Sequence, residues 1–166
     1  TIGGGIESVT LVMNERVNYD RIGDPWQREH YPGMDTSMIE TAEIVAERYG
    51  VSREAQDAYA LQSQQRTAQA QVDGRYDAEM APLTTRMRVQ DKTTGAVSVQ
   101  EVTLRLDEGN RPQTTLEDLQ KLQPVFKGGR LVAAGRFITA GNASQLSDGA
   151  AALVLMDSKL AEQRGL

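Results

Sequence analysis

The sequence predicts a mixed α/β chain, and three patterns carry this prediction. Apolar residues recur at helical spacing over residues 36–49 and, more sparsely, over residues 52–72. Two strand-like runs, 83–89 and 97–106, flank a turn that ends in Gly95. Helices and strands therefore both occur in the chain, and the expected fold class is α/β.

Further elements are expected on either side of this central part. Residues 6–12 read as a strand that follows three glycines, and residues 150–156 read as a buried strand. Residues 115–122 form a short helix, and a last helix starts within residues 157–164. Residues 13–34 show no steady period and are expected to form a long irregular loop, which in proteins is usually functional or part of an interface.

Local signals place the ends of these elements. Asp35 or Thr36 can cap the first helix, and Gly50 can end it in the left-handed conformation. Ser52 is the expected cap of the second helix, and a bulge near Glu101 would reconcile two phases of alternation in the second hairpin strand. For the short helix, two capping boxes are open, Thr114 with Glu117 or Thr115 with Asp118. The residues expected to pack in the core from the first helix are Ala42, Val45, Ala46 and Tyr49.

Composition excludes several classes of protein and site. The 166 residues are 39% hydrophobic and 25% charged, as in ordinary globular chains, and the formal net charge is −5. No basic stripe and no long apolar run is present, which argues against a nucleic-acid or membrane partner and makes the cytoplasm the expected location. The chain has no cysteine and a single histidine, His30, so it holds neither a cysteine nucleophile nor a multi-histidine metal site.

Separated segments of the sequence resemble the thiolase family, in the order in which that family carries them. Together they cover nearly the whole chain, which is therefore expected to be a middle fragment of a thiolase (acetyl-CoA C-acyltransferase or 3-ketoacyl-CoA thiolase). The matching segments are residues 4–8 (GGIES), 38–43 (MIETAE), 52–54 with 56–57, 63–66 (SQQR), 107–112 (DEGNRP) with 114–115, 139–144 (TAGNAS) and 148–152 (DGAAA).

The resemblance implies a division of the chain. Thiolases are built from three-layer α/β/α domains, each with a five-stranded mixed sheet. Residues 1–12 would be a strand of the N-terminal domain, and residues 144–166 its last strand and the start of the next helix. These two strands are neighbours in the family's sheet. Residues 13–143 would be the inserted α+β loop domain, which serves CoA binding and oligomerisation.

The resemblance also implies the chemistry and its missing parts. Thiolases cleave 3-ketoacyl-CoA with CoA, or condense acyl-CoAs, through an acyl-cysteine intermediate. The family's nucleophilic cysteine precedes the first strand of this chain, and its histidine, oxyanion-site asparagine and second cysteine follow the last residue. No catalytic residue and no metal ligand is therefore expected here, and the chain alone should be inactive. Coenzyme A is expected as a substrate, with no covalently bound cofactor.

Five positions match binding residues of the family. Met38 would face the acyl pocket, Arg111 the adenosine end of CoA, and Phe126, Ala140 and Ser144 the pantetheine arm. Each has a plain structural alternative: the apolar face of a helix for Met38, a solvated surface for Arg111, a core anchor for Phe126, and a tight turn for residues 139–144.

Departures from the family pattern favour a degradative enzyme. Ile39 stands where thiolases usually have glycine, and Ser37 stands where biosynthetic thiolases often have histidine. The intact protein is expected to be a homodimer or homotetramer. The alternative function is a non-catalytic thiolase-like module that binds acyl-CoA or serves oligomerisation.

Overall fold

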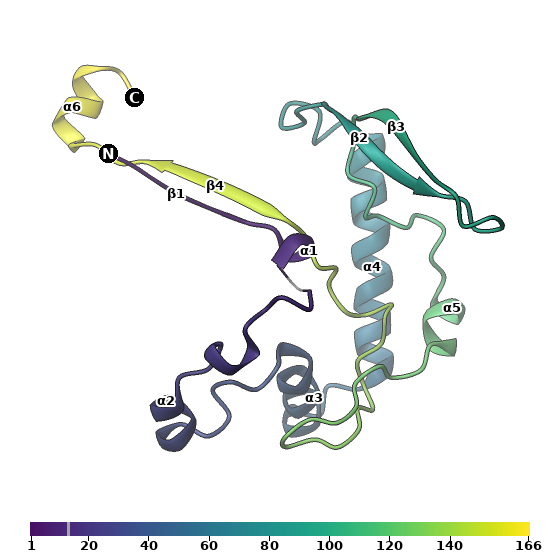
Figure 1. Cartoon of the computed structure of the whole chain (residues 1–166). Helices are drawn as coiled ribbons and strands as arrows, with labels where there is room; N and C mark the ends of the chain where they lie inside the picture. Colours follow the sequence, from purple (N-terminus) through teal and green to yellow (C-terminus); the bar gives the residue numbers. More distant parts are fainter. Residues whose placement is uncertain (13) are drawn as a thin grey trace. The chain divides into compact units, whose positions relative to one another are not determined.

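The computed structural model describes residues 1–12 and 14–166, with only the backbone of Thr10 described. The chain divides into two compact units (Figure 1). The first consists of Thr1–Asp35 with Ser144–Leu166, and the second of Thr36–Ala143.

The first unit is built on a two-stranded antiparallel ribbon. Strand β1 (Ile2–Glu7) pairs with β4 (Gly149–Val154), and its three glycines lie opposite small or apolar partners. A Cβ on Gly4 would stand 2.7 Å from the carbonyl oxygen of Ala151, so the close pairing requires glycine there. The expectation that the two terminal strands are neighbours is confirmed.

The expected bounds of the first strand are wrong. The strand runs through the glycines and ends at Glu7, and residues Val9–Val12 form a single helical turn, α1. The carbonyl of Ser8 accepts hydrogen bonds from the amides of Leu11 and Val12, and the Ser8 hydroxyl donates to Asp148 at 2.8 Å. These bonds turn the chain, so the apolar run beyond Ser8 does not continue the ribbon.

The expected irregular loop over residues 13–34 contains helical structure in its described part. A 3-10 turn, η1, spans Tyr19–Arg21, and helix α2 spans Pro25–His30. Asp24 caps α2 by accepting from the amide of Trp26, and proline occupies the first helical position. The signal for this helix was therefore local, an Asp-Pro pair that also reads as a turn.

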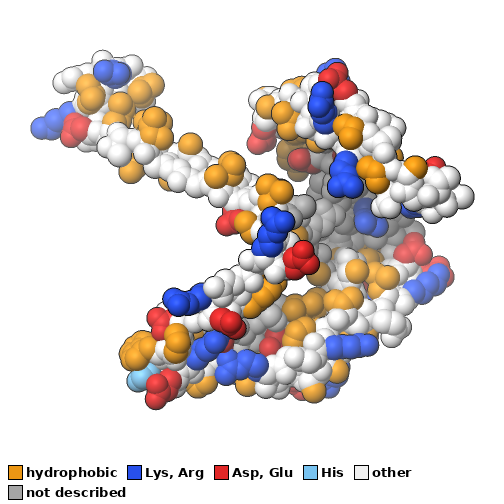
Figure 2. All heavy atoms as spheres, in the orientation of Figure 1, with side chains coloured by type: hydrophobic (Ala, Val, Ile, Leu, Met, Phe, Trp, Pro, Cys, Tyr) orange, Lys and Arg blue, Asp and Glu red, His pale blue; other side chains and the backbone are white. Residues whose placement is uncertain are grey.

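Helix α6 (Ser158–Gln163) follows the ribbon and is capped by Asp157. The ribbon itself keeps apolar side chains exposed on its strands, and Figure 2 shows hydrophobic side chains along it. They include Ile2, Ile6, Leu153 and Val154. Among the described residues, no helix is both long enough and apolar enough to cross a bilayer.

The second unit begins with two helices. Helix α3 spans Met38–Tyr49, and its cap is Ser37 rather than Asp35 or Thr36, because the Ser37 hydroxyl accepts from the amide of Glu40. Gly50 ends the helix at φ 65°, as expected. The 20-residue helix α4, Arg53–Val72, has the expected cap Ser52.

A hairpin and a short helix complete the second unit's regular structure. Strands β2 (Leu83–Gln90) and β3 (Val97–Leu104) pair without interruption, so the bulge expected near Glu101 is wrong: Glu101 lies directly opposite Arg86. Helix α5 (Leu116–Lys121) uses the second of the two proposed capping boxes. The Thr115 hydroxyl accepts from the amide of Asp118 and donates to its carboxylate.

The expected core face of α3 is only partly right. Ala46 is buried, with 4% of its surface exposed, and Ala42 is half-buried. Val45 and Tyr49 are 44% and 71% exposed, so their assignment to the core is wrong. The fully buried positions besides Ala46 are the acidic residues Glu40 and Glu43. The face of α3 that packs inward therefore meets polar groups rather than an apolar layer.

Ala46→Asp should destabilise the intact protein by several kcal/mol, because it places an unpaired carboxylate at a buried position of α3. The same substitution at the exposed Ala58 of α4 should change stability by only about 0.5 kcal/mol. Thermal and denaturant melts of both variants measure this difference. Equal losses for the two variants would show that Ala46 is not a core position.

Candidate functional site

The carboxylate of Glu43 is saturated by backbone amides of one segment. It accepts from Arg136 at 2.9 Å, from Phe137 at 3.1 Å and from Ile138 at 2.8 Å. These three residues belong to no helix or strand, so their N–H groups have no regular backbone ladder. A buried carboxylate that receives several N–H groups satisfies itself and the donors together. Glu43 thereby fixes the chain that leads into residues 139–144.

Glu40 does the same one helical turn earlier. Its Oε1 accepts from the amides of Leu131 and Val132 at 2.6 and 2.8 Å. These two hydrogen bonds lower the pKa of the Glu40 carboxyl below its usual value of 4.5, against the opposing effect of burial and with smaller contributions from the backbone amide and the charge of Arg130. The charged form of Glu40 is therefore the one that the fold favours.

Two glycines, Gly129 and Gly135, allow the backbone of residues 129–138 to approach the carboxylates of Glu40 and Glu43. A Cβ on Gly129 would collide with the Glu40 carboxylate and with the ring of Phe126. A Cβ on Gly135 would stand 2.5 Å from Glu43 Oε1 and 3.0 Å from Phe126 Cβ. Phe126 is half-buried, and its carbonyl accepts from the amide of Gly135 at 2.9 Å. Phe126 thus anchors the glycine-rich turn, which agrees with the structural alternative for this residue.

A second buried carboxylate centre lies on α4. Asp57, with 1% of its surface exposed, receives the Nε of Arg53 on both oxygens, at 2.8 and 2.9 Å. The same arginine donates through Nη2 to the carbonyls of Leu119 and Leu122 at 2.7 and 3.1 Å. Those carbonyls belong to the end of α5, so the pair ties α4 to α5. A buried charge is tolerated here because it is both paired and hydrogen-bonded.

Asn142 links Asp57 to residues 139–144. Its Nδ2 donates to Asp57 at 3.1 Å and to the carbonyl of Phe137 at 2.9 Å, while its Oδ1 accepts from the amide of Thr139 at 2.8 Å. The fully buried Thr139 accepts from the amide of Gly141 through its hydroxyl at 3.2 Å. A Cβ on Gly141 would stand 2.5 Å from a methyl group of Leu119, so the turn also needs glycine.

The residues of the 139–144 motif therefore fall into two sets, one packed inside and one exposed. Thr139, Gly141 and Asn142 are held inside by packing and hydrogen bonds, whereas Ala140, Ala143 and Ser144 are exposed. The Ser144 hydroxyl makes one long hydrogen bond, at 3.3 Å, to the carbonyl of Gln145. The tight-turn interpretation explains the inward residues. It leaves the outward residues, all small, available to a ligand.

A further contact fixes Arg111. Gln64 of α4 accepts the amide of Arg111 at 2.8 Å and the side chain of Asn110 at 2.9 Å, both through Oε1. The Arg111 side chain is exposed and takes part in no salt bridge within the part of the chain that the structure describes. These contacts fit the solvated-surface alternative for Arg111, and they equally leave its guanidinium exposed to a ligand.

Met38 opens α3 with 89% of its surface exposed, so it is not part of that helix's packed face in this chain. Met38, Arg111, Phe126 and Ala140 all belong to the second unit, and Ser144 is the residue at which the chain enters the first unit. Sequence reasoning did not assign roles to Glu40, Glu43, Asp57 and Asn142. The available signal was two glutamates spaced by three on the buried face of a helix.

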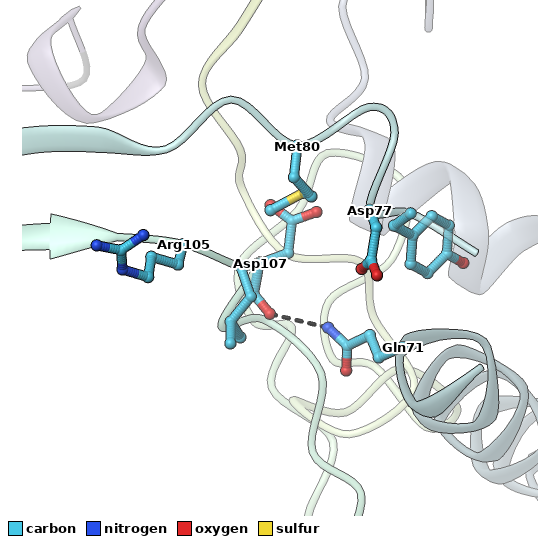
Figure 3. A pocket seen from close by; sticks show the side chains of 7 residues that line it. Gln71, Asp77, Met80, Arg105 and Asp107 are labelled. Carbon is cyan, nitrogen blue, oxygen red and sulfur yellow. Dashed lines mark hydrogen bonds between the residues drawn. The ribbon is translucent and has the colours of Figure 1, made fainter. Parts of the chain in front are cut away.

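The second unit also contains a pocket of about 240 Å³ (Figure 3). It is lined by residues at and after the C-terminal end of α4 and by the residues that follow β3. The side chain of Gln71 donates to the carbonyl of Asp107 at 3.0 Å, with Asp77, Met80 and Arg105 around it. None of the five expected binding residues lines this pocket. Within the described residues, no group of three acidic, histidine or cysteine side chains could hold a metal ion.

Replacing Glu40 with glutamine should weaken the acid dependence of stability. The pKa of Glu40 is lowered in the folded state. Its ionised carboxylate therefore contributes fully to the stability of the fold above a pH of about 4.5, and this contribution is lost as the pH falls through the folded pKa. Glutamine can still accept from Leu131 and Val132 but cannot titrate. Melts of Glu40→Gln from neutral pH downward should therefore fall less steeply than wild type, with the exposed Glu117→Gln as control. Parallel curves for Glu40→Gln and wild type would contradict this role.

Comparison with known proteins places the chain in a family. The family model described as "Thiolase, N-terminal domain" matches residues 2–159. The chain is 44% identical over 163 residues to mouse 3-ketoacyl-CoA thiolase B, peroxisomal, covering 98% of this chain and 35% of the relative. It is 40% identical over 166 residues to the 3-ketoacyl-CoA thiolase of Bacillus subtilis, covering 99% of this chain and 40% of the relative.

Solved structures agree with the sequence comparison. The human mitochondrial 3-ketoacyl-CoA thiolase in complex with CoA is similar with a TM-score of 0.64 and 36% identity, over 99% of this chain and 39% of that one. The acetyl-CoA acetyltransferase of Syntrophomonas wolfei has the same TM-score at 31% identity, over 99% and 40%. The chain spans between 35% and 40% of the lengths of these four proteins. On these matches, the chain belongs to the thiolase family.

Proposed function

We propose that the protein carrying this chain is a 3-ketoacyl-CoA thiolase that cleaves its substrate with CoA through an acyl-cysteine intermediate. The relatives named above support the activity, and they include enzymes named as 3-ketoacyl-CoA thiolases in mammals and in a bacterium. This chain contains no cysteine, so its own part is to bind CoA and the acyl group. The observation that carries this proposal is the outward face of residues 139–144.

That outward face suits the pantetheine arm of CoA. Pantetheine is a thin chain with two amides, so a protein backbone must come close to it to exchange hydrogen bonds. Ala140 and Ser144 present a methyl and a hydroxyl group and leave the adjacent backbone accessible. The hydrogen bonds of Asn142 hold this face in one shape before any ligand arrives, which lowers the cost of ordering it on binding.

Arg111 suits the phosphate-bearing adenosine end. A guanidinium can pair with phosphate oxygens and stack on adenine. Because the chain carries a net charge of −5, the attraction of the anionic CoA must come from individual cationic side chains near the ligand rather than from the net charge of the chain. Arg111 meets this demand with an exposed side chain on a fixed backbone.

Met38 and Phe126 complete the set at the acyl end and beside the pantetheine. Met38 is free to contact an acyl chain, and the half-buried Phe126 can offer part of its ring while it anchors the glycine-rich turn. The bulky Ile39 beside Met38 and the serine at position 37 favour a degradative enzyme with an acyl group other than acetyl.

The remaining assignments follow the family. We propose that the ribbon of β1 and β4 belongs to a wider sheet of the N-terminal domain, and that residues 13–143 form the loop domain. The exposed apolar side chains of the ribbon support the first of these, since a sheet with covered faces would bury them. We propose a homodimer or homotetramer for the intact protein. The relatives' names include peroxisomal and mitochondrial enzymes, so they do not favour the cytoplasm over an organelle.

Ser144→Trp in the intact protein should raise the KM for CoA strongly while the melting temperature stays close to wild type. Ser144 is exposed, so an indole does not disturb packing in this chain, but it fills the space that a pantetheine at Ser144 would use. Thiolysis kinetics with varied CoA measure the effect, and Ser98→Trp on the exposed hairpin is the control. A folded Ser144→Trp variant with an unchanged KM for CoA would remove Ser144 from the site.

Arg111→Ala should weaken the binding of CoA more than the binding of pantetheine, because pantetheine lacks the phosphates and the adenosine. The difference should shrink as salt is raised, because ions screen an exposed guanidinium from a phosphate. Thiolysis with either thiol as the acyl acceptor, at two ionic strengths, gives the comparison. Equal losses of binding for both thiols, or no loss for either, would show that Arg111 is an ordinary solvated surface residue.

A further inference from the structure

We propose that Gln64 is a positioning residue that sets Arg111 for the phosphate-bearing end of CoA, and that α4 thereby fixes the spacing between the two ends of the CoA surface. This inference rests on the proposed function, in which Arg111 contacts that end. It assigns to Gln64 a role in ligand specificity without direct contact with the ligand.

Gln64 holds the Arg111 segment with two of its own oxygens. Its side-chain Oε1 accepts the amide of Arg111 at 2.8 Å and the Nδ2 of Asn110 at 2.9 Å. Its backbone carbonyl accepts the same Nδ2 at 2.9 Å. Asn110 and Gln64 are both half-buried, so these hydrogen bonds are partly shielded from water. The loop that carries Arg111 is therefore docked on the middle of a long helix.

The other side of Arg111 is held as well. Its carbonyl accepts the amide and the hydroxyl of Thr114, at 3.0 and 2.8 Å. Pro112 follows and restricts the backbone conformation of the residue before it. Both backbone polar groups of Arg111 are thus engaged, while its guanidinium is exposed. This arrangement presents one cation to a ligand at low entropic cost, because only the side chain remains to be ordered.

The same helix holds the pantetheine end. Asp57 of α4 binds Asn142, which orders residues 139–144, and Gln64 lies seven residues further along. At about 1.5 Å per residue, the two attachment points are roughly 10 Å apart along the helix axis. Because a helix does not stretch, the separation between the turn at residues 139–143 and the backbone of Arg111 is fixed by α4. A ligand of the length of CoA is thereby favoured over one that lacks the adenosine end.

The side chain of Gln64 offers a clean series of variants. Its role here is that of an acceptor, because both contacts use Oε1. Gln64→Glu retains an acceptor of the same length, whereas Gln64→Leu removes it at similar size. Gln65 is the next residue of the same helix and is exposed, so Gln65→Leu is the matched control for a change of glutamine to leucine on α4.

The test measures thiolysis by the intact protein with CoA and with pantetheine as acyl acceptors. Gln64→Leu should raise the KM for CoA about three- to tenfold, the effect of losing one or two hydrogen bonds, and should leave the KM for pantetheine and both kcat values unchanged. The single variants Gln64→Glu and Gln65→Leu should both keep the wild-type KM for CoA. Gln64→Leu added to Arg111→Ala should cause no further loss, since Gln64 acts through Arg111.

The outcomes separate the two proposals. If Arg111→Ala raises the KM for CoA and folded Gln64→Leu does not, the positioning role falls and the CoA role of Arg111 stands. If neither variant affects CoA, the assigned role of Arg111 falls, and the inference falls with it. Equal losses for CoA and pantetheine would mark Gln64 as merely structural and overturn the inference. Should Gln64→Leu fail to fold, Asn110→Ala takes its place under the same criteria, because Asn110 is the other partner of Oε1.

Discussion

The second unit depends on one constraint: a length of chain without regular secondary structure must have its backbone amides satisfied while it lies against α3. Glu43 accepts three of those amides and Glu40 accepts two. An unsatisfied buried N–H costs about 1–3 kcal/mol, and because these five hydrogen bonds are part-buried, each donor left without a partner would cost a share of that amount. The two glutamates take the place that a neighbouring strand fills in a sheet. The glycines at positions 129 and 135 follow from this, because only they allow the approach.

The proposed binding surface is a consequence of the same network. Asp57 and Asn142 pull the inward half of residues 139–144 into the unit, which leaves the small residues of the outward half exposed. Gln64 docks the loop that presents Arg111. In the proposed function, structure and ligand recognition share residues 139–144 but use different side chains of that stretch.

Local signals in the sequence predicted some helix ends and missed others, since the cap of α3 is Ser37 rather than Asp35 or Thr36. Ser52 caps α4, and Thr115 with Asp118 caps α5, because capping needs only neighbours in the chain. The expected strand at residues 6–12 was wrong, since strand β1 is decided by a distant partner that fits its glycines. Tyr49 was assigned to the core on periodicity alone. Periodicity cannot reveal that the neighbours of α3 are backbone amides, which select glutamate for the buried face. The thiolase resemblance was confirmed, while the five binding residues remain proposals.

Amide hydrogen exchange of the intact protein tests this account most directly. The account predicts that the amides of Leu131, Val132 and residues 136–138 exchange slowly, at rates comparable with the interior of α4, although none lies in a helix or strand. It further predicts that Glu43→Gln speeds exchange selectively at residues 136–138, because the neutral amide is a weaker acceptor than the carboxylate. Rates at these amides as fast as those of amides fully exposed to water, in the wild-type protein, would contradict the account.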